Sequence, residues 1–209
     1  MPQPAQPILL YGFRLSGHSH RAELMLSLLG LPFEFHPVDL ASGEQRGAAF
    51  LRLNTFGTVP VIDDGGTVIA DSAAILVYLA LAYDPARRWL PADPAGAAAV
   101  QRWLSAAQGP LANGPALVRF AKAFGGSFDL ERPRQITDRI LTQLDSHLAR
   151  RSYLVGEGPT LADIAMYSYV AAAPEGGIAL EPYGATGAWL ERIEALPNFI
   201  PMPKVGGAS

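Results

Sequence analysis

The hydrophobic pattern of this chain changes its period repeatedly over the first 83 residues and is helical from there on. The apolar runs "ILLYGF" and "FEFHPVDL" are typical of strands, whereas Ala22, Met25, Leu26 and Leu29 between them recur at helical spacing. A helix near "GAAFLRLN", two strands joined by the hairpin signal "DDGG" and the helical run "DSAAILVYLALAY" follow. The order β-α-β-α-β-β-α predicts an α/β domain, a small mixed sheet with helices on its faces.

A stretch with three prolines, "DPARRWLPADP", separates this region from the remainder of the chain. Proline lacks a backbone donor and breaks regular structure, so we interpret residues 84–94 as a linker. Every periodic segment beyond it is helical, although Gly109-Pro110 and Gly114-Pro115 are expected to kink or break the chain. The sequence therefore predicts an N-terminal domain over 1–83, the linker, and an all-α domain over 95–209.

Two segments of the second half are typical of packed helices. In "TLADIAMYSYVAAA", Thr160 and Asp163 have the spacing of a capping box with Asp in place of Glu, and we interpret both residues as structural. The segment "ERPRQITDRILTQLDSHLAR" carries four apolar residues at four-residue steps on one helical face: Ile136, Ile140, Leu144 and Leu148. The segment "ATGAWLERIEAL" predicts one more amphipathic helix.

Composition argues against several classes of function. A net charge of −3 gives no reason to expect a nucleic-acid partner, and the longest uncharged apolar run is too short to span a membrane. The start "MPQPAQP" lacks the pattern of a signal peptide, and cysteine is absent, so we expect a cytoplasmic protein without a catalytic thiol of its own. No metal site is predicted, because the four histidines lack a zinc-ligand spacing: His18, His20, His36 and His147.

Four stretches, spread in order over almost the whole chain, resemble the cytosolic glutathione transferases. They are "SGHSHRAELMLSLLGLPFE", "NTFGTVPVIDDGG", "DSAAILVYL" and "PTLADIAMY". The first is similar to the family's first-helix motif, nearest the Ser-Ser-Cys-x-x-Arg pattern of the zeta class, and the second to the segment with its cis-proline, here Pro60. The resemblance implies a thioredoxin-like domain joined to an all-α domain, glutathione as cosubstrate, a homodimer and a role in detoxification.

The resemblance also implies where glutathione binds. Its γ-glutamyl head carries an ammonium and an α-carboxylate. Asp71 can accept from the ammonium, and Ser72 at a helix N-terminus can hold the carboxylate. A cis bond at Val59-Pro60 would turn the Val59 N–H and C=O outward, to pair with the backbone of the glutathione cysteine.

The glycyl carboxylate of glutathione needs a donor or a cation, and Gln45 and Arg46 lie in the loop where the resemblance places that contact. Each assigned residue also has a structural interpretation. Asp71 with Ser72 can be a helix cap alone, Val-Pro can be an edge or a turn, and Arg46 can be a solvated surface charge.

The polar loop "RLSGHSHR", between the first strand and the first helix, is where a bound thiol would be ionised. A free thiol has a pKa of about 8.5, and mostly thiolate at neutral pH requires a fall of roughly 2 units, or ~2.7 kcal/mol. A hydroxyl that donates to the thiolate contributes ~1.5–3 kcal/mol. A helix N-terminus adds about 0.3–1 kcal/mol. One hydroxyl at the start of one helix is thus about sufficient.

Three hydroxyls near this loop compete for that role. Ser16 stands where the zeta-like pattern has its catalytic serine, five residues before Arg21, which we interpret as structural. Ser19 is an alternative donor and also the better plain N-cap, and Tyr11 ends the first strand, near where the tyrosine-type classes keep their catalytic tyrosine. His18 stands where the pattern has its cysteine, as a loop histidine or a ligand contact.

The sequence therefore predicts a glutathione transferase that acts on a small electrophile. The resemblance and the apolar residues place this electrophile in a pocket lined by Phe13, Leu15, Leu111 and Leu117. A glutathione-dependent disulfide reductase or peroxidase is a second interpretation, since glutathione would supply all the sulfur chemistry. A non-catalytic carrier of apolar ligands with the same fold is a third.

Overall fold

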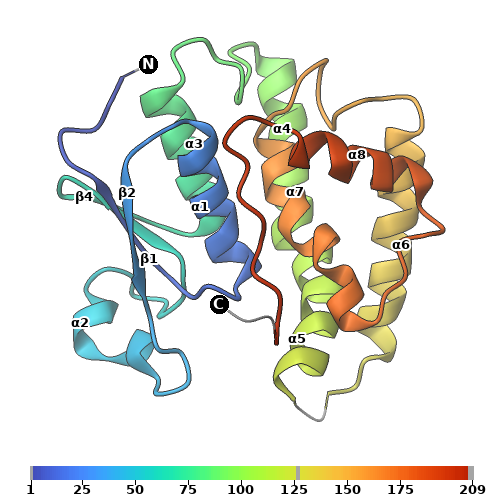
Figure 1. Ribbon diagram of the computed structural model, residues 1–209, viewed down its shortest axis with the longest axis horizontal. Helices are drawn as coiled ribbons and strands as arrows, with labels where there is room; N and C mark the ends of the chain where they lie inside the picture. The colour runs from blue at the N-terminus through green and yellow to red at the C-terminus, as the bar shows by residue number, and fades with distance from the viewer. Residues whose placement is uncertain (1, 126–127, 207–209) are drawn as a thin grey trace. The chain divides into compact units, whose positions relative to one another are not determined.

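The computed structural model describes residues 2–125 and 128–206, which divide into two compact units. The first consists of the chain up to Arg87 together with Pro197–Met202, and the second contains Arg88–Leu196. The division after Arg87 falls inside the proline-rich stretch 84–94. In Figure 1 the strands belong to the first unit and the second unit is helical.

The first unit is built on a four-stranded sheet in the order β2-β1-β3-β4. The strands are β1 (Ile8–Gly12), β2 (Phe33–Pro37), β3 (Val61–Asp64) and β4 (Thr67–Ala70). β1 pairs in parallel with β2 and antiparallel with β3, which pairs antiparallel with β4. Helices α1 (Gly17–Leu28) and α3 (Ser72–Tyr83) lie side by side against this sheet (Figure 1). The predicted α/β order and mixed sheet are confirmed.

The helix expected over 47–54 is shorter than predicted. A 3₁₀ turn at Glu44–Arg46 leads into α2, which covers only Ala48–Leu51. Helix formation stops because the Asn54 side chain donates to the backbone oxygen of Thr58 at 2.8 Å and accepts from the Phe56 N–H at 3.0 Å. Asparagine side chains commonly stabilise loops in this way, in competition with the helical backbone.

The hairpin between β3 and β4 closes with two glycines at positive φ, Gly65 at 57° and Gly66 at 97°. At its base the Asp64 carboxylate accepts hydrogen bonds from the hydroxyls of Tyr78 and Tyr83 in α3, at 2.7 and 2.5 Å. Burial and the neighbouring carboxylate raise the pKa of Tyr78 to about 12, so both hydroxyls keep their protons. The hairpin is thereby tied to the helix that follows it.

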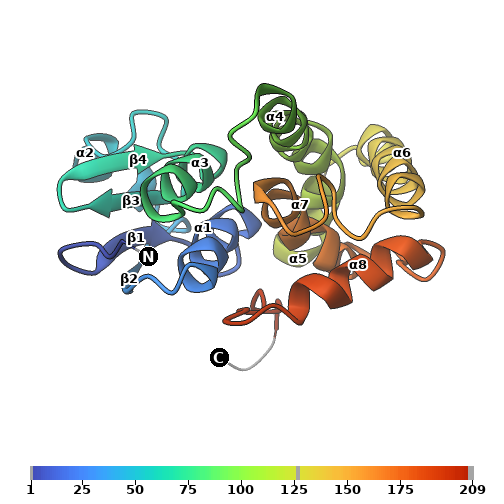
Figure 2. The same cartoon turned by 90° about the horizontal axis from the view of Figure 1, so that it is seen from above.

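The second unit contains only helices and turns over the residues that the structure describes. They are α4 (Pro94–Gln108), α5 (Leu117–Phe124), α6 (Glu131–Leu148), α7 (Leu161–Ala171) and α8 (Gly184–Glu194), with a 3₁₀ turn at Ala173–Gly176. Figure 2 shows α7 surrounded by the other helices, and every residue from 161 to 170 is buried. None of the helices described here is long and apolar enough to cross a membrane.

The predicted capping box at the start of α7 is confirmed, with Thr160 and Asp163 capping each other. The Asp163 carboxylate accepts from the Thr160 N–H at 2.8 Å, and from the Leu154 N–H and the Trp189 indole N–H at 2.9 Å each. Burial raises the pKa of Asp163 despite these donors. Asp163 thus connects three segments of the helical unit, in keeping with a structural role.

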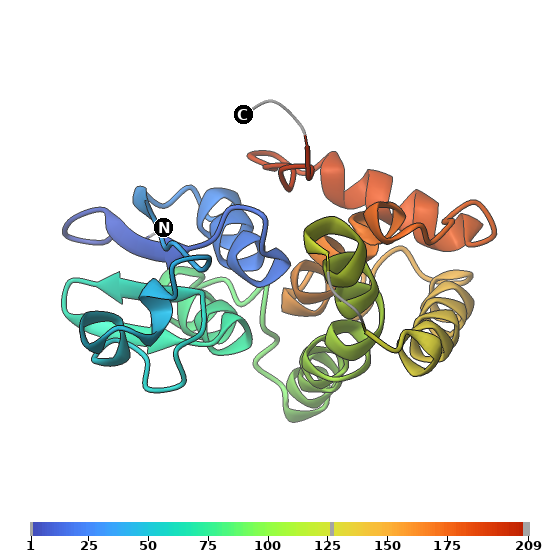
Figure 3. The ribbon, with the colours of Figure 1, turned by 90° about the horizontal axis from the view of Figure 1, so that it is seen from below.

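The first Gly-Pro pair ends a helix, as expected, because α4 stops at Gln108 and Gly109 has non-helical backbone angles of −97° and −99°. The second pair does not interrupt the helical path. Between α4 and α5 the chain forms a π-helical segment, Ala112–Ala116, which accommodates Pro115 (the path runs from green to yellow-green in Figure 3). A wider π turn tolerates a residue without a backbone donor. Gly114 lets α6 approach, because a Cβ there would lie 3.0 Å from the Ile136 side chain.

The segment Pro197–Met202 packs with the first unit, although the sequence assigned it to the helical domain. His20 of α1 contacts the Ile200 backbone oxygen through Nε2 at 2.8 Å. The Ser27 hydroxyl donates to the Asn198 backbone oxygen at 2.6 Å. We call this segment the C-terminal strap, because it is bound along α1 at two points.

Candidate active site

Ser16 is the N-cap of α1, with extended backbone angles of −85° and 121°. Its Oγ accepts a hydrogen bond from the Ser19 N–H at 3.3 Å, and its backbone oxygen accepts from the His20 N–H at 2.9 Å. Within the described part of the chain, no acceptor takes the proton of the Ser16 hydroxyl. The residue is half-buried. The hydroxyl is therefore oriented by one accepted bond and retains its donor for a ligand.

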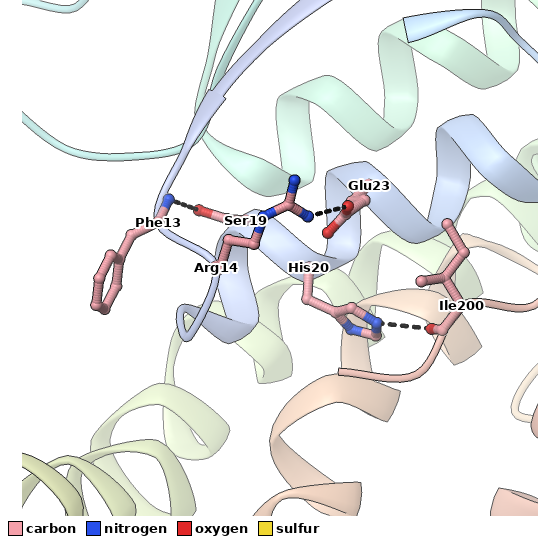
Figure 4. Close-up of polar contacts among 6 residues, drawn as sticks. All are labelled: Phe13, Arg14, Ser19, His20, Glu23 and Ile200. Carbon is pink, nitrogen blue, oxygen red and sulfur yellow. Dashed lines mark hydrogen bonds and ion pairs between the residues drawn. The ribbon is translucent and has the colours of Figure 1, made fainter. Parts of the chain in front are cut away.

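Ser19 does not cap the helix, so its interpretation as the better plain N-cap is wrong. Ser19 lies inside α1, and its Oγ accepts from the Phe13 N–H at 3.1 Å (Figure 4). Its side chain closes against Gly12, where an added Cβ would lie 3.1 Å from the Ser19 oxygen. The hydroxyl is buried, at 1% exposure, and fastens the end of β1 to α1.

Tyr11 lies on β1 and packs against a small cluster of Val38, Phe50 and Val61. The centre of its ring is 5.3 Å from that of His36 on β2. Because side chains alternate along a strand, Tyr11 points to the opposite face from Leu10, which is fully buried. Tyr11 is half-buried beside α2, whereas Ser16 begins α1.

Asp71 is the N-cap of α3, as the sequence allowed. Its Oδ1 accepts from the N–H groups of Ala73 and Ala74 at 2.8 and 3.1 Å. Asp71 is exposed, and its φ of 76° is unusual for a residue other than glycine. Ser72 follows as the first helical residue, and the hydrogen bonds described leave its N–H without an acceptor. The start of α3 thus combines a carboxylate and an open N–H.

A histidine and an arginine from α1 meet Ser72. His18 Nδ1 lies 3.0 Å from Ser72 Oγ and 2.8 Å from the Arg21 guanidinium, which is 3.3 Å from the same Oγ. Arg21 and Ser72 are each 1% exposed. Burial, with a smaller effect from the Arg21 charge, lowers the pKa of His18 to about 3. His18 is therefore neutral at physiological pH.

The bond between Val59 and Pro60 is cis, as expected. In the described structure neither the N–H nor the C=O of Val59 has a hydrogen-bond partner. The 3₁₀ turn that carries Gln45 lies beside the loop that leads to Val59, because a Cβ on Gly57 would come within 2.9 Å of the Gln45 backbone oxygen. The loop therefore places an unpaired piece of backbone next to this turn.

Gln45 is half-buried and its side-chain Oε1 is enclosed without a partner among the described residues. Arg46 is exposed. A buried amide oxygen without a hydrogen bond is uncommon and indicates a contact that a ligand can complete.

The four residues of the predicted electrophile pocket fall in different units. Phe13 and Leu15 are half-buried in the loop after β1. Leu111 is fully buried in the helical unit, and Leu117 lines a groove of about 740 Å³ in that unit with Ile136 and other residues. Their grouping into one pocket stays a prediction.

Comparison with known proteins shows the family of this chain. Residues 15–82 match the family model "Glutathione S-transferase, N-terminal domain", and residues 115–197 match "Glutathione S-transferase, C-terminal domain". Glutathione S-transferase 3 of Zea mays is 34% identical over 218 residues, which cover 94% of this chain and 96% of the maize protein. The chain belongs to the glutathione S-transferase family.

Two further relatives of this glutathione transferase are informative. A crystal structure of a glutathione S-transferase from Pseudomonas fluorescens Pf-5 has a TM-score of 0.88 at 34% identity, covering 95% of this chain and 100% of that one. It confirms the thioredoxin-like and helical fold. A zeta-class glutathione S-transferase of Euphorbia esula is 47% identical over 92 residues, only 44% of this chain and 40% of that protein. The zeta-like character is thus found over part of the chain.

The contact of His18 and Arg21 with Ser72 is the feature of this transferase that sequence reasoning missed. One signal was available. Arg21 precedes Leu24 by three residues and Met25 by four, so it occupies the apolar face of α1. A cation on that face must be buried with a polar partner.

Proposed function

We propose that this glutathione transferase transfers the glutathione thiolate to small apolar electrophiles, and that the Ser16 hydroxyl stabilises the thiolate. One observation carries the proposal: the hydroxyl accepts from the Ser19 N–H and has no protein acceptor among the described residues for its own proton. A donor fixed before the ligand arrives needs little reorganisation to meet a developing anion. The N-terminus of α1 adds a favourable potential at the same point.

The other glutathione contacts follow from the site. The unpaired N–H and C=O of Val59 would pair with the cysteine backbone of glutathione. The Ser72 N–H at the start of α3 would bind the α-carboxylate of the head, and Asp71 its ammonium. At the glycyl end, the Gln45 amide N–H would donate to the carboxylate, and Arg46 would supply a positive charge.

The electrophile pocket keeps the predicted lining of Phe13, Leu15, Leu111 and Leu117. We also propose a homodimer, supported by Phe56, whose side chain is 87% exposed between α2 and Val59. Burial of this aromatic side chain against a second copy would remove apolar surface from water. We further propose a cytoplasmic detoxification role, which the family and the absence of cysteine support.

Calorimetry and turnover test this function together. We expect glutathione to bind at one site per chain and an aryl halide to be conjugated, with the rate limited by the thiolate fraction. Parallel assays with a hydroperoxide and a disulfide separate the reactions. Turnover of the disulfide alone would identify a reductase, and tight binding without any turnover would identify a carrier.

A further inference from the structure

Three polar atoms form a closed triangle between the starts of α1 and α3. His18 Nδ1, Ser72 Oγ and a terminal nitrogen of Arg21 lie 2.8 to 3.3 Å from one another. His18 and Ser72 are 54 positions apart in the sequence, so the triangle is a tertiary contact. His18 is the second residue of α1, and Ser72 the first of α3.

The chemistry of the three groups fixes where the protons lie. A guanidinium only donates, so His18 Nδ1 must carry a lone pair toward Arg21. The imidazole is therefore neutral and holds its proton on Nε2. Ser72 Oγ accepts from Arg21, which leaves the serine proton to point at His18 Nδ1. The Ser72 side chain is thus oriented by two contacts, because its oxygen accepts from Arg21 and its proton is donated to His18.

We propose that His18 is a positioning residue for glutathione binding: as the shared acceptor of Arg21 and Ser72, it holds the first turn of α3 in the arrangement that receives the γ-glutamyl head. This inference rests on the proposed placement of that head at Ser72. The depressed pKa of His18 agrees with it, because a protonated ring would place a cation against the Arg21 guanidinium.

His18 acts on the head and not on the sulfur. The described contacts of its Nδ1 run to Ser72 and Arg21, while the hydroxyl of Ser16 is oriented separately by the Ser19 N–H. Without the acceptor, the Ser72 hydroxyl loses the group it donates to and Arg21 loses one of its acceptors, so fewer molecules hold the binding-competent arrangement. The apparent affinity for glutathione then falls by the same factor, with the bound complex unchanged.

The test uses two variants that differ in whether an acceptor remains at this position. In His18→Asn the amide oxygen takes the place of Nδ1 as acceptor, whereas in His18→Leu the acceptor is lost. We expect His18→Leu to raise the KM for glutathione about tenfold, the scale of one lost hydrogen bond to a charged group. Its kcat and the pKa of bound glutathione should stay within about twofold and 0.3 units of the parent's. His18→Asn should restore most of the affinity.

A double-mutant cycle with Ser72→Ala separates positioning from general loosening of α1. If His18 acts through Ser72, adding His18→Leu to Ser72→Ala should raise KM by much less than tenfold. Additive effects, a lowered kcat, or equal losses in the Leu and Asn variants would each overturn the inference. Failure of the parent enzyme to bind glutathione at all would instead remove the proposed function.

Nitrogen-15 spectra of the histidine rings in the parent enzyme provide a readout that does not depend on the kinetics of any variant. With the His18→Asn spectrum for assignment, the parent His18 should show an unprotonated Nδ1 and a protonated Nε2 at neutral pH. A proton on Nδ1 would refute the triangle, whatever the kinetics show.

Discussion

Replacing Ser16 by alanine tests the proposed thiol activation most directly. The Ser16 hydroxyl is the group with an uncommitted proton at the start of α1, and its donation to a thiolate would contribute about 1.5–3 kcal/mol. One pKa unit corresponds to ~1.36 kcal/mol, so the loss raises the pKa of bound glutathione by roughly 1 to 2 units. At neutral pH the reaction should slow by about 10- to 150-fold.

The same substitution removes a helix cap, and this second effect needs its own control. The Ser16 oxygen accepts from the Ser19 N–H, and replacing such a cap by alanine costs about 0.5–2 kcal/mol of stability. Replacing such a cap by glycine costs only a few tenths of a kcal/mol, or roughly 0.3 kcal/mol. Ser16→Gly should therefore match Ser16→Ala in thiol pKa while unfolding at a higher temperature, and Ser16→Thr should keep both properties.

Titrating the ultraviolet absorbance of the bound thiolate measures the pKa shift without reference to turnover. The rate deficit should also shrink at alkaline pH, where the thiol ionises unaided. The reasoning fails if Ser16→Ala binds glutathione with an unchanged thiol pKa. A raised pKa in Tyr11→Phe or Ser19→Ala instead would assign the role to that hydroxyl.

Three further predictions concern affinity, assembly and pH. Asp71→Asn should weaken glutathione binding by ~1–3 kcal/mol, which calorimetry measures. KM should rise and kcat should stay unchanged, because Asp71 would hold the γ-glutamyl head equally in the ground state and in the transition state. Phe56→Ser should shift the enzyme toward monomer in light scattering; an unchanged dimer would remove Phe56 from the contact. Burial lowers the pKa of His20 to about 4, so the unfolded state binds more protons below pH 6.5, and stability should fall from there toward pH 4. His20→Gln should flatten that fall in urea titrations from pH 7 to pH 4, and an unaltered slope would contradict the assignment.

Short sequence motifs correctly predicted the elements that are stabilised by residues close together in the sequence. The two glycines of "DDGG" supply the positive φ values of the hairpin, and Asp71 caps α3 from the neighbouring position. Thr160 and Asp163 satisfy each other's caps within four residues, which is why that motif could be interpreted from spacing alone. The order of strands and helices along the chain followed from the change of hydrophobic period.

The errors occur where two local solutions compete or where the partner is distant. Ser16 and Ser19 are both suitable N-cap residues by type. The Ser19 side chain instead accepts a hydrogen bond from the Phe13 N–H after β1, and this contact depends on the tertiary structure. The helix over 47–54 stopped early because Asn54 bonds its own loop. The meeting of His18 with Ser72 bridges 54 positions, and no periodic pattern encodes such a contact.

The C-terminal strap makes the first unit discontinuous along the gene. The sheet and helices of the first unit are encoded before residue 88, whereas the strap that lies along α1 is encoded after Leu196. A chimaera that exchanges everything beyond the linker for a relative's sequence would also exchange the residues that contact His20 and Ser27. The first unit is therefore a two-part module, and a recombinant keeps these two contacts only if its C-terminal segment follows the same path along α1.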